Sequence, residues 1–184
     1  WARRWGEETG AGRASRAGVA CRHALQLGRS RAASWHGCGV VALDARNIEL
    51  ALTRFQRAYT LDPELIDAWV AHGEVALAHR DFEEAARLFG EALSREPAHY
   101  PALVERGIAL RALGAVNDSR AHYRRAIAAS PDRPEAWFDL ALALESTGEL
   151  EEAARAYEGF LDRAPLEMSA ERRRAERFLA ARPE

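Results

Sequence analysis

The chain has 184 residues, of which 48% are hydrophobic and 29% are charged, and its formal net charge is −2 at pH 7. These values suit a globular or solenoid protein. No stretch is long and apolar enough for a transmembrane helix or a secretory signal, so we expect no direct membrane insertion. All 26 basic residues are arginine, and this together with the many alanines favours a GC-rich bacterial source. The sequence does not decide between cytoplasm and periplasm.

Residues 1–31 form a basic segment with seven arginines and two glutamates, whereas residues 32–184 carry 19 arginines and 26 acids. A basic arm can bind nucleic acid. Here the arginines are scattered and no aromatic pattern accompanies them, so we expect no nucleic-acid partner. The segment is either a degenerate copy of the repeat that follows, with a helix over 13–28, or a basic N-terminal arm. Because the chain begins with Trp1 and not with methionine, we expect a fragment or a processed form.

A fixed period organises residues 32–167. Pro63, Pro97, Pro131 and Pro165 stand 34 residues apart, and each follows an aromatic residue by eight positions. When the proline is numbered position 32, four repeats result: 32–65, 66–99, 100–133 and 134–167. Such a period indicates a stack of similar supersecondary units, and not one globular core. The aromatic residues, at position 24, are Phe55, Phe89, Tyr123 and Tyr157.

Each repeat is predicted to contain two antiparallel helices. Positions 4, 7, 8 and 11 share one face of the first helix, and positions 17, 20, 24 and 27 share one face of the second, because residues three and four apart are neighbours on a helix. Small residues at positions 8 and 20 let the two backbones approach, and the proline ends the second helix. These small residues are Gly39, Gly73, Gly107 and Ala141, and Ala51, Ala85, Ser119 and Ala153.

The repeated residues resemble the tetratricopeptide repeat pattern, with tryptophan at position 4, glycine at 8, alanine at 20 and proline at 32. The resemblance implies an all-α fold, a right-handed α-solenoid of stacked antiparallel helix pairs. Position 7, usually leucine, is a core site, so we expect Cys38 to act as a buried small hydrophobe and His72 as a core histidine. Position 4 is occupied by Trp35, Trp69, Leu103 and Trp137.

The resemblance also implies a concave binding groove, lined by positions 2, 5, 9 and 12 of the first helices. This stripe is apolar along its middle and more acidic than basic at its edges, with Glu105 and Asp139 near the rim. It suits an apolar, amphipathic or basic helix of a partner protein. Family members that clamp a C-terminal carboxylate use Lys, Asn and Arg here; only Arg111 is of this kind, so we expect no such clamp. Alternatively, the N-terminal segment or a steeper superhelix covers these side chains. The expected groove residues are His36, Val40, Leu43, Val70, Glu74, Leu77, Val104, Ile108, Arg111, Phe138, Leu142 and Glu145.

Residues 168–184 are predicted to hold a capping helix over 168–181. Phe178 and Leu179 are its large apolar residues among many charges. A terminal repeat needs a polar outer face for solubility, and such a helix supplies it. We therefore expect the run Arg172–Arg174 to be a solvated face and not a binding site.

The sequence contains no pattern typical of catalysis, a cofactor or a metal centre. The histidines form no H-E-x-x-H motif, and Cys21 and Cys38 are 17 residues apart without a C-x-x-C pair. His72 and His79 could share a helix face, but metal binding is not expected there. The pairs Glu83–Glu84 and Glu151–Glu152 stand where a second helix begins, and there carboxylates favour the helix dipole. We expect no enzyme activity.

The sequence thus predicts a non-catalytic scaffold or adaptor for protein–protein interaction. Two other classes stay open. The chain could be the repeat arm of a larger enzyme of glycosyl- or sulfotransferase type, which the full reading frame would reveal. It could also be a structural subunit of a large membrane-associated, secretion or pilus assembly, which would self-associate on a sizing column.

Overall fold

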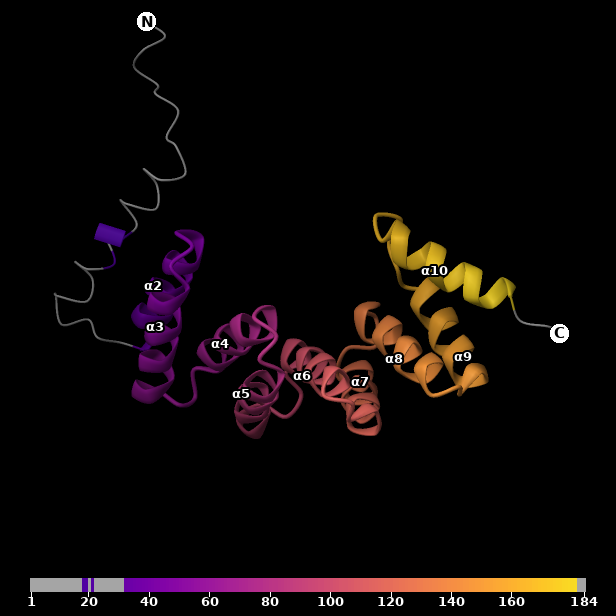
Figure 1. Cartoon of the computed structure of the whole chain (residues 1–184), viewed down its shortest axis with the longest axis horizontal. Coiled ribbons are helices and arrows are strands. Elements are labelled where there is room, and N and C mark those ends of the chain that lie inside the picture. The colour runs from indigo at the N-terminus through magenta and orange to yellow at the C-terminus, as the bar shows by residue number, and fades with distance from the viewer. Residues whose placement is uncertain (1–17, 20, 22–31, 182–184) are drawn as a thin grey trace, which may run out of the picture. The chain divides into compact units, whose positions relative to one another are not determined.

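The computed structural model describes residues 18, 19, 21 and 32–181. Within these residues the fold is all-α and contains no strand, which confirms the predicted all-α solenoid (Figure 1). The expected degenerate repeat over 1–31 lies almost entirely outside the described residues. The helices are α2 (Ala32–Asp44), α3 (Ile48–Leu61), α4 (Ile66–Ala78), α5 (Phe82–Arg95), α6 (Tyr100–Ala112), α7 (Val116–Ala129), α8 (Glu135–Ser146), α9 (Leu150–Leu161) and α10 (Ser169–Ala180).

The chain forms two compact units. Unit 1 ends at His79 and contains α2, α3 and α4. Unit 2 begins at Arg80 and contains the helices α5 to α10. Inside each unit, helices that follow one another in the chain pack side by side, as α2 does with α3 and α6 with α7. Each unit is described by itself below.

The turn between the two helices of a repeat uses the same backbone conformation in all four repeats. Position 15 has a positive φ at Arg46 (58°), Arg80 (63°), Gly114 (81°) and Gly148 (78°). Glycine adopts this conformation without steric cost, whereas an L-residue with a side chain does not. Two repeats therefore have the residue that the turn favours, and two hold an arginine there against its preference.

Close packing of a glycine against a ring joins the two helices of a repeat. A Cβ placed on Gly39 of α2 would lie 2.4 Å from the Phe55 ring of α3. A Cβ on Gly107 of α6 would lie 2.5 Å from the Tyr123 ring of α7. Both rings are fully buried. The small residue at position 8 and the ring at position 24 are therefore two halves of one contact, which explains why they recur together.

The carbonyl of the recurring proline is a hydrogen-bond acceptor for the next repeat. The indole nitrogen of Trp69 donates to the Pro63 carbonyl at 2.9 Å, and that of Trp137 donates to the Pro131 carbonyl at 3.1 Å. The third repeat has leucine in place of this tryptophan, and there Arg125 donates to the Pro97 carbonyl at 2.9 Å. The bond satisfies a carbonyl beyond the end of a helix, where no intrahelical donor is available.

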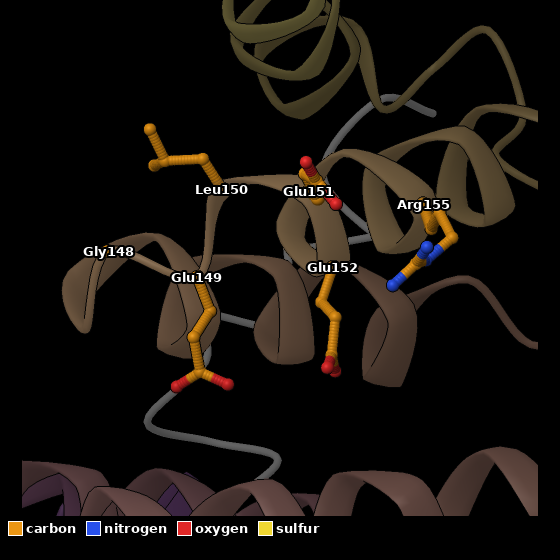
Figure 2. Close-up of a pocket in the computed structure, with 6 residues that line it drawn as sticks. All are labelled: Gly148, Glu149, Leu150, Glu151, Glu152 and Arg155. Atoms are coloured by element: carbon orange, nitrogen blue, oxygen red, sulfur yellow. The ribbon is translucent and has the colours of Figure 1, made fainter.

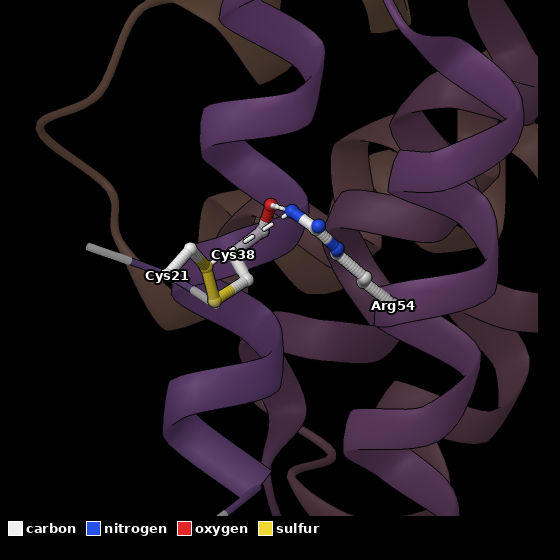
Figure 3. Close-up of a disulfide and its surroundings, with 3 residues drawn as sticks. All are labelled: Cys21, Cys38 and Arg54. Atoms are coloured by element: carbon white, nitrogen blue, oxygen red, sulfur yellow. Dashed lines mark hydrogen bonds between the residues drawn. A yellow bond between two sulfur atoms is a disulfide. The ribbon is translucent and has the colours of Figure 1, made fainter. Parts of the chain in front are cut away.

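A disulfide between Cys21 and Cys38 ties the start of the described chain to α2 (Figure 3). Cys38 is buried, as expected, and it is also half of a cystine, a pairing that the sequence did not predict. The buried Arg54 of α3 donates to the Cys38 carbonyl at 2.7 Å and lies 4.0 Å from the Cys21 sulfur (Figure 3). A spacing of 17 residues carries no pattern from which this pair could be inferred.

Helix α10 packs on α9 and continues the repeat register. Ala175 falls at position 8 of a further repeat and is fully buried, and the Phe178 ring lies 4.9 Å from that of Tyr157. The expectation of a solvated arginine face holds for Arg173 and Arg174, which are exposed, but is wrong for Arg172, which is partly buried. Arg172 donates to the carbonyls of Leu161 and Ala164 after α9, and Arg174 bonds to Tyr157 and Glu145.

Candidate docking surface

The expected groove residues lie on the first helices of the repeats, namely α2, α4, α6 and α8. They differ widely in exposure. Val40 is 40% exposed, whereas Val70 and Val104 are each only 7% exposed and offer little surface to a ligand. The remaining groove residues lie between these limits or, like Glu74, are exposed. Neighbouring side chains bury these two valines, and the position of a residue within the repeat does not predict that burial.

The candidate docking face of unit 1 combines α2 and α4, which contact each other. Leu43 packs against the cluster of Ala42, Phe55 and Val75, so only part of its side chain is open. His36 lies 5.7 Å from the Phe55 ring, centroid to centroid. Although much of the Glu74 residue is exposed, desolvation of its carboxyl group raises its pKa from the usual value. The face is therefore mainly apolar and carries one partly desolvated acid.

The candidate docking face of unit 2 combines α6 and α8, which also contact each other. Ile108, Phe138 and Leu142 are half-buried and pack against the core of this unit. The Phe138 ring lies 5.0 Å from that of Phe160 and 6.0 Å from that of Tyr157. Phe138 is thus a partly buried residue that packs against the core, and a charge placed there would damage folding.

Glu145, the last groove residue of unit 2, is already engaged within the protein. The hydroxyl of Tyr157 donates to its carboxylate at 2.7 Å, and Arg174 of α10 donates at 3.1 Å. Burial and the bond to Glu145 raise the pKa of Tyr157 to about 12. Helix α10 therefore neutralises the acid at this end of the face, and sequence reasoning missed the contact because the partners are 29 residues apart.

A polar cluster stands at the junction of α6, α7 and α8. Asp139 of α8 has a side chain only 16% exposed, and its carboxylate lies 3.9 Å from the guanidinium of Arg111 of α6. Burial is the largest influence on this carboxyl group and raises its pKa to about 6, although Arg111 acts in the opposite direction. Beside these groups the Tyr123 side chain of α7 is fully buried. Asp139, which the sequence placed near the rim of the groove, is thus a strongly desolvated acid.

The hollow at the start of α9 is lined by residues 148–152 and Arg155 (Figure 2). Figure 2 shows Glu149 and Glu152 extending in the same direction from the start of this helix. Glu149 forms an ion pair with Arg120, and Glu152 forms one with Arg124 at 2.9 Å. The bonds from Arg120 and Thr147 lower the pKa of Glu149. These acids join repeats, and the hollow shows no arrangement suited to catalysis.

Among residues 32–181 and the three described positions before them, no group of three potential ligands could hold a metal ion. His72, expected in the core, is half-buried and lies 3.3 Å from the hydroxyl of Tyr59 through its Nδ1. None of the helices in this part of the chain is both long and apolar enough to cross a bilayer.

Comparison with known proteins identifies the repeat. A family model described as tetratricopeptide repeat matches residues 70–134 and 104–167, which together cover more than half of the chain. No curated protein sequence matches. Among solved structures, the protein MamA is similar with a TM-score of 0.76 and 17% identity over 92% of this chain and 95% of that one.

Two further structures are similar. The pilF protein of Pseudomonas aeruginosa has a TM-score of 0.75 and 17% identity over 93% of this chain and 83% of its own. TTC0263, described as a thermophilic protein with this repeat from Thermus thermophilus, has a TM-score of 0.69 and 22% identity over 92% of each chain. At these identities the likeness concerns the fold alone.

Proposed function

This chain belongs to the tetratricopeptide repeat family, whose members generally act as scaffolds for protein–protein interaction, and we propose that it is a non-catalytic adaptor. It would hold a segment of a partner protein against the face of α2 and α4 in unit 1 or against the face of α6 and α8 in unit 2. The observation that carries the proposal is the set of apolar side chains left half-open on these faces, which are Val40, Leu43, Leu77, Ile108, Phe138 and Leu142.

Half-open apolar side chains support docking because their remaining surface is still in contact with water. Covering it contributes about 25 cal/mol for each Å² removed from water. A partner helix that presents apolar residues at helical spacing covers several such side chains at once. The acids Glu74 and Asp139 stand beside them, so a segment with positive charge next to its apolar residues fits better than an acidic one.

Site-specific photocrosslinking tests the proposal. We expect a photoreactive phenylalanine analogue in place of Leu142, on the proposed face, to crosslink to a discrete partner protein in cells of the source organism. The same analogue in place of Arg155, an exposed residue of α9, is the control. Crosslinking at Leu142 but not at Arg155 supports the adaptor. Equal crosslinking at both positions, or at Arg155 alone, would contradict it.

A variant series provides a second check. Val40→Glu changes an exposed side chain of unit 1, and Ile108→Gln removes apolar surface from unit 2 without adding a charge. We expect each to weaken partner capture while the Tm changes by only a few degrees. A fall in capture that merely follows the fall in Tm would mean that these side chains serve folding and not docking.

A further inference from the structure

Helix α10 uses two of its four arginines to dock on the helices before it. Arg172 donates to two carbonyl groups at the end of α9 and just after it, and Arg174 donates to the Glu145 carboxylate of α8. The other two, Arg173 and Arg177, are exposed, and no carboxylate among the described residues pairs with either of them. The Nε of Arg177 donates to the Arg173 carbonyl at 3.2 Å, a bond within the helix. Both positive charges therefore remain open to a partner.

These two arginines line a hollow on the outer surface of α10. The hollow has a volume of about 410 Å³, and its lining residues are Arg173, Glu176, Arg177 and Ala180. They are three and four positions apart and so share one face of the helix. The stem of an arginine side chain is apolar and its tip is charged. The hollow thus offers apolar surface next to two positive groups one helical turn apart.

A further helix pair would not fit this face in the way that one repeat packs on another. The residues at position 10 of the earlier first helices in this unit, Ala109 and Ala143, are small and fully buried. Arg177 has the same position in α10 and is exposed. A helix packed closely on α10 would bury this guanidinium, and removing a charge from water is costly. A ligand that leaves the arginine tips partly in water fits better.

The charges on this face also select the class of ligand. Glu176 stands between Arg173 and Arg177 in the sequence, and its carboxylate lies 3.9 Å from the Arg172 guanidinium. A nucleic acid or an anionic membrane presents many phosphates, which this carboxylate would repel. A protein segment can instead place one carboxylate opposite each arginine and an uncharged residue opposite the glutamate. Arginine also matches a carboxylate in geometry, because it can donate two parallel hydrogen bonds to it.

We propose that the hollow on α10 is a second docking site of this chain, for an acidic segment of a partner protein. The segment carries two carboxylates one helical turn apart, which pair with Arg173 and Arg177, and an apolar residue beside them fills the hollow. This differs from the expectation that the run Arg172–Arg174 is not a binding site. The proposal does not rest on the face of α6 and α8, which suits apolar and basic segments. An adaptor with both surfaces can hold two segments of opposite charge.

Selection from a phage-displayed library of helical peptides tests the site. The library is first depleted on the full chain carrying Arg173→Glu and Arg177→Glu, and the remaining phage are then selected on the parent chain. We expect the enriched peptides to carry two aspartates or glutamates three or four positions apart, next to an apolar residue. The proposal is wrong if no peptide is enriched, or if the enriched peptides lack this acidic pair.

The affinity of one enriched peptide, measured by fluorescence anisotropy, tests each arginine. Arg173→Gln and Arg177→Gln should each weaken binding about two- to fivefold, as expected for an ion pair near the surface. Binding should also weaken with added salt. Arg155→Gln, at an exposed arginine of α9, is the matched control and should leave the affinity unchanged. Equal effects of all three changes would mean that only the net charge of the protein matters, and would overturn the site.

A reversal of charge on both partners separates direct contact from an effect on folding. Because Arg173 and Arg177 are exposed, their replacement should change the Tm by no more than a few degrees. A peptide in which lysines replace the two acids should bind the chain carrying Arg173→Glu and Arg177→Glu more tightly than it binds the parent. If the lysine peptide showed no such preference, the arginines would not contact the peptide and the proposal would fall.

Two further measurements exclude other locations and other ligands. Ile108→Gln, on the face of α6 and α8, should leave the affinity of the acidic peptide unchanged. Weakening as large as that from Arg177→Gln would place the peptide on that face and overturn a separate site. Vesicles containing phosphatidylglycerol should not retain the parent chain. If they retained it and released the chain carrying Arg173→Glu and Arg177→Glu, the ligand of α10 would be a lipid surface and not an acidic segment.

Discussion

The two units use one repeat pattern and share the tryptophan–proline bond, but they differ in the other contacts between successive helix pairs. In unit 1 the Tyr59 ring stacks on Trp69 of the next repeat at 3.8 Å, and a disulfide adds a covalent tie. In unit 2, arginines join the repeats, as in the pair of Arg124 with Glu152 and the bond from Arg125 to the Pro97 carbonyl. The recurring positions therefore determine how a helix pair forms, while the contacts between pairs vary with local sequence.

The largest loss of stability is expected at a contact that both units contain, between the small residue at position 8 and the ring at position 24. Gly107→Ala in unit 2 would place a methyl group 2.5 Å from the Tyr123 ring, and Gly39→Ala in unit 1 would place one 2.4 Å from Phe55. We expect each to lower the free energy of unfolding by about 3 kcal/mol, at the upper end of overpacking costs. Urea denaturation followed by circular dichroism would measure it.

Gly37 is the matched control for this contact, since it lies on the same helix as Gly39 but has nothing within 4 Å of an added Cβ. Gly37→Ala should stabilise the protein by about 0.5–1 kcal/mol, because alanine is the better helix residue. If Gly39→Ala and Gly37→Ala had the same effect, the close approach of glycine and ring would not be the reason for the small residue.

The disulfide is the sharpest difference between the units. Reducing Cys21–Cys38, or replacing both residues with serine, should destabilise unit 1 by about 2–4 kcal/mol. Unit 2 should be unaffected. Hydrogen exchange measured helix by helix, with and without a thiol reductant, would show faster exchange in α2, α3 and α4 of unit 1 and no change in the helices of unit 2. Equal loss of protection in α8 and α9 would mean that the two units unfold as one.

Position 15 offers a comparison within the same turn. Arg46 has a φ of 58° in unit 1, and Gly114 has a φ of 81° in unit 2. Arg46→Gly should stabilise unit 1 by about 1 kcal/mol, whereas Gly114→Ala should destabilise unit 2 by a similar amount, because a Cβ is unfavourable at positive φ. Thermal melts of the two variants should shift in opposite directions. A shift in the same direction would show that the turn relaxes to another conformation.

The helix pairs could be predicted from the sequence because their determinants are local. A proline every 34 residues, a glycine such as Gly107 and a ring such as Tyr123 all act within one repeat. The contacts that sequence reasoning missed join distant positions without a period, as the disulfide and the bond between Arg174 and Glu145 do. Exposure within the candidate site was also beyond prediction. Val40 and Val70 lie in the predicted groove stripe of neighbouring repeats and differ because of what packs around them.

The smallest expected changes in stability come from removing the hydrogen bonds to the proline carbonyls. The donor to Pro63 in unit 1 is a neutral indole, and the donor to Pro97 in unit 2 is a charged guanidinium. Trp69→Phe removes the donor to Pro63 in unit 1, and Arg125→Met removes the donor to Pro97 in unit 2. Each should cost about 1 kcal/mol, the net value of one hydrogen bond.

Arg124→Met is the control for the arginine, because it removes only an exposed ion pair with Glu152 and should cost less than about 0.5 kcal/mol. At high salt the cost of Arg124→Met should vanish, since exposed charges are screened, while that of Trp69→Phe should persist. If Arg125→Met cost no more than Arg124→Met, the arginine would not replace the missing tryptophan, and the third repeat would have no equivalent of the tryptophan–proline bond.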